Sequence, residues 1–173
     1  MRLDDHVYIP DGVLELRAYN TQGKLLDYVH GGNIVVNGGR EALARLMGND
    51  PGSWSVDAMK FGDAGHEPLT PHNMVPVDVS DTDLYGTTHV TIGLTGSGVG
   101  DFQTMDVNWP VEGKKVQFVA PVEADQGNGT DTAEYSEAGL FYNNGSIMFA
   151  HKSFSYIIKN STIRLVATWT FTF

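Results

Sequence analysis

The stretch that decides the fold is the last eleven residues, Ile163-Arg164-Leu165-Val166-Ala167-Thr168-Trp169-Thr170-Phe171-Thr172-Phe173. Apolar and polar side chains alternate along it with a period of two, which is typical of a β-strand with one buried face. β-branched and aromatic residues favour such a surface. The buried face is predicted to contain Ile163, Leu165, Ala167, Trp169, Phe171 and Phe173. We therefore predict a long last strand that lies in the interior of a sheet or in an interface.

The residues just before this strand predict a hairpin. Asn144-Gly145 separates two apolar stretches, Glu134–Tyr142 and Ser146–His151. Asn and Gly both tolerate the positive φ that a tight hairpin turn requires. Ser153–Lys159 then leads through Asn160-Ser161 into the last strand.

The first part of the chain contains further short strands and one helix. Strands are predicted at Val13–Tyr19, Lys24–Val29, Ala58–Gly62, His89–Leu94 and Lys114–Val122, whereas residues 72–86 are predicted to be irregular. The helix is predicted at about 38–48, with Asn37 or Gly38 as its cap. Its packed face would contain Ala42, Leu43, Leu46 and Met47.

The pattern as a whole predicts one domain, 1–173, of the mainly β class. It contains eight to ten short strands and lacks the alternating βαβ rhythm of a parallel sheet. We expect an antiparallel β-sandwich or a partly open barrel with one short α-helix.

Composition excludes several functions. The net charge of −10 is unsuited to binding a nucleic-acid backbone or an anionic membrane surface. The absence of cysteine excludes disulfides and cysteine-based metal sites. The first residues lack the apolar core of a secretory signal, and no stretch approaches the roughly 18 apolar residues of a membrane span.

The carboxylates do not single out a catalytic pair. They are Asp78, Asp81, Asp83, Asp101, Asp106, Glu123, Asp125, Asp131, Glu134 and Glu137. Most fall in predicted loops, where solvation is the ordinary state, so substitution of Asp81 or Asp125 is expected to be mild. A glycosidase would need two carboxyl groups held about 5 to 9 Å apart.

The sequence gives equally weak signals for a calcium, zinc or sugar-binding site. The oxygen-rich loop Asp125–Asp131 could hold calcium, but it lacks the EF-hand spacing and reads more readily as an acidic turn. The six histidines show no zinc-binding spacing. Trp54 and Trp109 could stack on sugars, although aromatic residues near loops more often pack locally. The sequence therefore assigns no catalytic, cofactor-binding or metal-ligating residue.

Several motifs together resemble small structural proteins of tailed bacteriophage virions. The motifs are Gly32–Arg40, Met59–Gly62, Ser136–Phe141 (SEAGLF), Ile147–Phe154, Ile157–Lys159 and Thr168–Phe173. They occur in the same order as in those proteins and cover about half of the chain. The resemblance implies a neck, collar, tail or baseplate component without catalytic activity, assembled in the host cytoplasm and located in the virion. A capsid decoration protein and a carbohydrate-binding β-sandwich of a host-receptor module are the alternatives.

The resemblance also implies that the partners are copies of the chain itself and other phage structural proteins, with no nucleic acid and no membrane. We expect a symmetric homo-oligomer, because closed rings of identical subunits reuse one heterologous interface. Contacts are expected at sheet edges and in the loops 63–86 and 94–113, since loops on a rigid scaffold commonly carry interactions.

Overall fold

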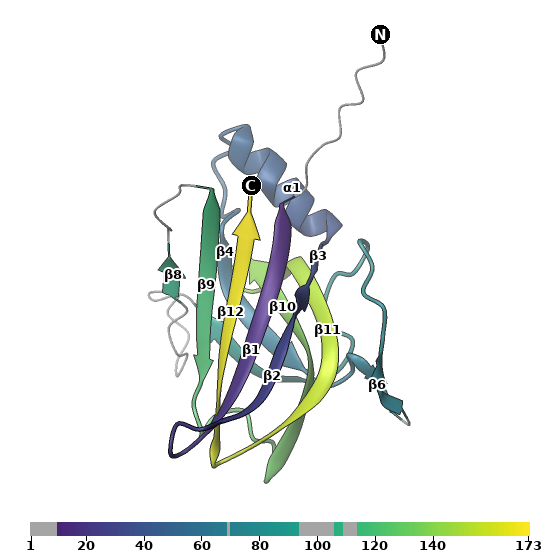
Figure 1. Ribbon diagram of the computed structural model, residues 1–173. Coiled ribbons are helices and arrows are strands. Elements are labelled where there is room, and N and C mark those ends of the chain that lie inside the picture. Colours follow the sequence, from purple (N-terminus) through teal and green to yellow (C-terminus); the bar gives the residue numbers. More distant parts are fainter. Residues whose placement is uncertain (1–9, 69, 94–105, 109–113) are drawn as a thin grey trace.

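The structure, a computed structural model, describes residues 10–68, 70–93, 106–108 and 114–173. Two five-stranded sheets pack face to face, and every described strand pair is antiparallel (Figure 1). Among the described residues strand far outweighs helix, which confirms the predicted mainly β class. Since the strands form two separate sheets, the architecture is a sandwich.

The two sheets are named here by their strands. Sheet I consists, in spatial order, of β2 (Leu25–Gly32), β1 (Asp11–Asn20), β12 (Ile163–Thr172), β9 (Lys115–Val122) and β8 (Asp106–Asn108). Sheet II consists of β3 (Ile34–Val35), β11 (Ile147–Asn160), β10 (Thr132–Tyr142), β4 (Val56–Gly62) and β7 (Thr88–Gly93). A short ribbon of β5 (His66–Glu67) and β6 (Thr70–Met74) and the helix α1 (Asn37–Met47) complete the described elements.

The last strand lies inside sheet I, as predicted. β12 pairs with β1 on one side and with β9 on the other (Figure 1). Trp169 is fully buried, and its ring stacks on that of Phe171 with 6.5 Å between centroids. Phe173 departs from the prediction, because it follows the end of β12 and is 57% exposed.

The predicted hairpin at Asn144-Gly145 is confirmed. Asn143, Asn144 and Gly145 have φ values of 55°, 58° and 69°. The carboxylate of Asp57 accepts hydrogen bonds from the backbone N–H groups of Asn144 and Gly145, at 2.6 and 3.0 Å. The strand that leaves the turn is longer than expected, since β11 runs without a break to Asn160.

The helix begins at Asn37, but its predicted cap was wrong. Val36 occupies the N-cap position and makes no side-chain capping bond. Its own N–H donates to the carbonyl of Phe149 at 3.1 Å, so sheet II leads directly into the helix. Leu46 and Met47, both expected on the packed face, are 49% and 89% exposed because they lie in the last turn, beyond the buried Ala42.

The outer face of sheet II is covered by the segment 63–86. This segment was predicted to be irregular from residue 72, but β6 extends to Met74. A small second core, formed by Val36, Ala58, Leu84, Phe141 and Met148, lies on this side. Of the predicted loop 94–113, only β8 belongs to the described residues; Asp101 and Trp109 lie outside them. Among the described residues, no helix is long and apolar enough to cross a membrane.

Candidate functional site

A buried carboxylate organises the covered face of sheet II. Glu137 on β10 is fully buried. Its Oε1 accepts hydrogen bonds from the N–H groups of Ala64 and Gly86, at 3.1 and 2.9 Å. Its Oε2 accepts one from the N–H of Tyr85 at 2.8 Å and lies 3.1 Å from Nε2 of His151. Glu137 thus fixes two separate parts of segment 63–86 to the sheet.

His151 extends this site to a second carboxylate. The ring is fully buried, and its Nδ1 lies 2.8 Å from Oδ2 of Asp81. The same oxygen accepts hydrogen bonds from the Tyr85 hydroxyl and the Asp78 N–H, both at 2.8 Å. Each ring nitrogen of His151 therefore lies within hydrogen-bonding distance of a carboxylate oxygen.

Hydrogen bonding favours the charged form of both carboxylates. Burial alone would raise the pKa of Glu137, but His151 and three backbone N–H groups outweigh it, so that the pKa is lowered. Burial likewise opposes ionisation of Asp81, and the bonds from Asp78, His151 and Tyr85 lower its pKa overall. Both groups are therefore held as anions around the imidazole.

This arrangement is suited to holding structure rather than to transferring protons. Every oxygen of Glu137 already accepts a hydrogen bond, and both nitrogens of the His151 ring face carboxylate oxygens. The nearby Ser136 Oγ accepts from the Gly65 N–H at 2.9 Å, and Ser153 Oγ donates to the Val75 carbonyl at 2.6 Å. The described pockets are lined by other residues.

The interpretation of these carboxylates as solvated loop residues was wrong for two of them. Glu137 is buried, and the side chain of Asp81 is only 10% exposed. Five others, Asp78, Asp83, Asp125, Asp131 and Glu134, are exposed as expected, whereas Glu123 is half-buried and ion-paired with Arg164. The Glu–His–Asp arrangement was missed because its members are distant in sequence; the apolar neighbours of Glu137 were the only local signal.

The loop considered for calcium receives a cation from the chain itself. Lys159 on β11 is fully buried, and its ammonium donates to Asn128 Oδ1 at 2.8 Å and to the Ala124 carbonyl at 3.3 Å. Burial lowers the pKa of Lys159 to about 8, partly opposed by the charges of Asp125 and Glu123. Among the described residues, no group of three His, Asp or Glu side chains could hold a metal ion.

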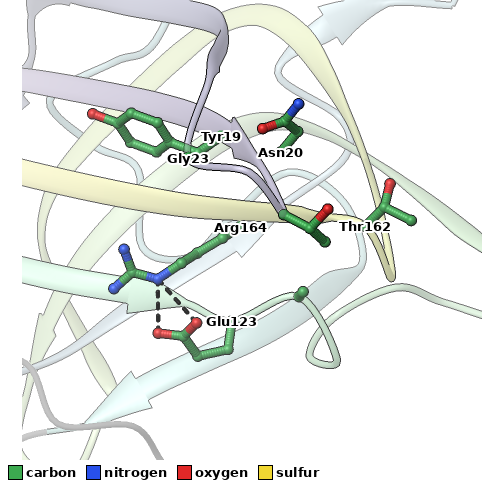
Figure 2. A pocket seen from close by; sticks show the side chains of 8 residues that line it. Tyr19, Asn20, Gly23, Glu123, Thr162 and Arg164 are labelled. Atoms are coloured by element: carbon green, nitrogen blue, oxygen red, sulfur yellow. Dashed lines mark hydrogen bonds and ion pairs between the residues drawn. The ribbon is translucent and has the colours of Figure 1, made fainter.

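A polar hollow lies at the same end of the sandwich (Figure 2). It has a volume of about 500 Å³ and is lined by Tyr19, Asn20, Thr21, Gly23, Glu123, Ala124, Thr162 and Arg164. Arg164 Nε donates to both oxygens of Glu123, at 2.8 and 2.9 Å. The hollow is open and offers hydroxyl, amide and charged groups beside one aromatic ring.

An apolar groove of about 390 Å³ lies at the opposite end, between α1 and the C-terminal end of β12. It is lined by Leu43, Leu46, Trp54, Ser55, Val56, Val116, Phe118, Phe149, Phe171 and Phe173. Leu46 and Phe173 at its rim are 49% and 57% exposed. Trp54, considered for sugar stacking, packs against Tyr142 and under the Arg45 guanidinium, which is 4.3 Å from its ring. The groove is suited to another apolar surface.

Comparison with protein-family models, with curated proteins and with solved structures finds no match for this chain.

Proposed function

We propose that the chain is a structural component of a tailed bacteriophage particle, of the neck, collar, tail or baseplate, and acts by assembly without catalysis. The sequence resemblance names the class of particle. Two features of the fold support the proposal physically. One is the partly exposed apolar groove, and the other is the buried polar network around Glu137.

The apolar groove is the observation that carries the proposal. Leu46 and Phe173 line this groove and have exposed fractions of 49% and 57%. Large apolar patches on protein surfaces commonly mark contact sites. Aromatic side chains such as Phe173 and Trp54 are the residues that most often contribute the binding energy of protein interfaces.

The buried polar network points in the same direction. Glu137, His151 and Asp81 form hydrogen bonds with backbone groups and with each other. These bonds hold segment 63–86 against the outer face of sheet II. A rigid scaffold of this kind can present edges and loops in a fixed geometry to neighbouring subunits.

The test is the location of the protein. Peptide mass spectrometry and a density map of intact particles are expected to find it in the neck, tail or baseplate, and the purified chain is expected to form oligomers. Density on the capsid shell would instead favour a decoration protein. Absence from particles, together with a monomeric mass at high concentration, would overturn the proposal.

The polar hollow of Figure 2 favours a second candidate, a carbohydrate-binding module. Tyr19 supplies a ring for stacking, whereas Glu123, Arg164 and Asn20 supply polar groups of the kind that fix sugar hydroxyls. Binding on a glycan array that is lost in Tyr19→Ala would support this candidate. No binding at millimolar glycan would remove it.

A further inference from the structure

A buried amine contacts a side-chain amide beside the polar hollow. Lys159, near the end of β11, is fully buried. Its Nζ donates to Oδ1 of Asn128 at 2.8 Å and to the carbonyl of Ala124, a residue that lines the hollow, at 3.3 Å. Both acceptors are amide oxygens and not carboxylates, so neither contact supplies a counter-ion. The amine therefore lies against a carboxamide, whose carbon Cγ is an electrophile.

The loop that contains Asn128 holds its amide in place. Gly127 and Gly129, on either side, have φ values of 61° and 59°, a conformation that glycine adopts without strain. The Tyr135 hydroxyl donates to the Gly127 carbonyl at 2.9 Å and so attaches the loop to β10. Nδ2 of Asn128 donates to the Ala124 carbonyl at 2.8 Å. Both polar atoms of the amide are thus fixed, with Oδ1 bound to the amine.

Burial also prepares the amine to act as a nucleophile. Only the neutral form of an amine is nucleophilic, and burial favours that form. Burial lowers the pKa of Lys159 from 10.5 to about 8, partly opposed by the charges of Asp125 and Glu123. At pH 8 about half of this amine is neutral, whereas less than about one-hundredth of an exposed lysine is neutral there. The two carboxylates are bases that can carry a proton released in a reaction.

We propose that Lys159 and Asn128 are the site of an intramolecular isopeptide bond. Nζ of the neutral lysine attacks Cγ of Asn128 and forms a new C–N bond. The bond between Cγ and Nδ2 breaks, and one proton of Nζ passes to the departing nitrogen, which leaves as ammonia. The products are one secondary amide and one ammonia molecule, so the reaction needs no oxidant, reductant or cofactor. Contact between the two groups in the folded chain favours this reaction over the same reaction in solution.

The structure shows the two side chains before the reaction, joined only by a hydrogen bond. Until the bond forms, the amine titrates and contributes to the pH dependence of stability. Once formed, the bond closes a loop between residues 31 apart in the sequence. As with a disulfide, such closure restricts the unfolded chain and stabilises the folded one. The chain contains no cysteine, so disulfides cannot serve this purpose. The inference is independent of the proposed function.

Intact mass spectrometry of the full chain tests the bond, because its formation removes one molecule of ammonia. After incubation at about pH 9, where most of the amine is neutral, the wild type is expected to be lighter than its sequence by that amount. Lys159→Met is expected to keep its full sequence mass. An Asn-Gly pair can also lose ammonia by cyclising on its own backbone, so Asn144→Ser, which removes the other such pair in a described turn, is the control and should retain the loss. A wild type of full sequence mass, or a loss that persists in Lys159→Met, would overturn the proposal.

Tryptic peptides locate the bond. Trypsin cuts after a free lysine, so the unreacted chain yields 116–152 and 153–159 as separate peptides. It does not cut after an acylated lysine, so the reacted chain is expected to yield 116–152 joined to 153–164, with the link at Asn128. Asn128→Ser keeps an acceptor for the amine but removes the carboxamide, so the joined peptide should be lost. Circular dichroism checks that both variants fold. Separate peptides alone in the wild type, or a link at another residue, would contradict the proposed bond.

Discussion

Glu137→Gln is the substitution that probes the buried network most sharply. The amide has nearly the shape of the carboxylate, and its oxygen can still accept from the N–H groups of Ala64 and Gly86. Its NH₂ group would then face the Tyr85 N–H, so this donor loses its acceptor, and the negative charge that strengthens the other bonds is removed. Each unsatisfied buried group costs about 1 to 3 kcal/mol, and a hydrogen bond to a charged group contributes about 1.5 to 3 kcal/mol. We expect a loss of about 3 to 5 kcal/mol in the free energy of unfolding.

Urea denaturation followed by tryptophan fluorescence measures this loss, and the melting temperature should fall by about 6 to 20 °C. The matched control is Glu134→Gln on the same strand, where the side chain is 56% exposed and lies 3.8 Å from His66 Nε2. The control is expected to change stability by less than about 0.5 kcal/mol. A loss below about 1 kcal/mol in Glu137→Gln, or one equal to that of the control, would refute the role given to the network.

The same network predicts the response to acid. The pKa values of Glu137 and Asp81 are lowered below their ordinary values of 4.5 and 3.8. Between the unfolded and folded values, the unfolded chain binds more protons, so the free energy of unfolding decreases as the pH falls. The contribution is complete above about pH 5 and is lost at lower pH. Glu137→Gln should show a shallower decrease than the wild type across this range.

Three further outcomes are expected. Between about pH 8 and 10 the free energy of unfolding should rise with pH, because the pKa of Lys159 is lowered to about 8 from 10.5 and the unfolded chain binds more protons there. Lys159→Met should abolish that rise in urea titrations, and an unchanged slope would contradict the assignment. Gly145→Val should lower stability by about 1 to 2 kcal/mol, because φ is 69° and a β-branched residue is strained there; Gly145→Asn should cost less, as a thermal melt would show. Trp169→Ala should cost about 3 to 5 kcal/mol in the same melt, since the ring is fully buried and donates to Asn33 Oδ1 at 3.0 Å.

Most strands of the sandwich could be predicted because the buried face of a strand and the conformation of a turn are determined by short stretches of sequence. The alternation from Ile163 onward reports which face of β12 is buried, and Asn144-Gly145 reports a backbone conformation that few other residues adopt. Both predictions agree with the structure, because neither depends on distant parts of the chain. Phe173 and Met47 were misplaced for one shared reason: periodicity shows which way a residue points, but not where the neighbouring element ends.

The buried charges could not be predicted in the same way. Asp81 and His151 are 70 residues apart, and Lys159 meets Asn128 across 31 residues. A carboxylate or an ammonium in a polar stretch is usually solvated. The exceptions arise only when the fold places a partner within hydrogen-bonding distance, which no single segment encodes.

The buried charged groups and the apolar groove differ in whether the chain itself covers them, and this difference supports the proposed function. At Glu137 and Lys159, the chain itself supplies the partners of the buried charged groups. Where apolar groups gather at Leu46 and Phe173, the described part of the chain leaves them half-exposed. Burying a charged group without a partner is costly, so those sites have to be completed within the subunit. Apolar surface can stay exposed in the free chain, and its burial in the proposed assembly would contribute favourable free energy. A subunit that completes its polar network alone, but leaves its apolar end open, is suited to forming contacts with other subunits.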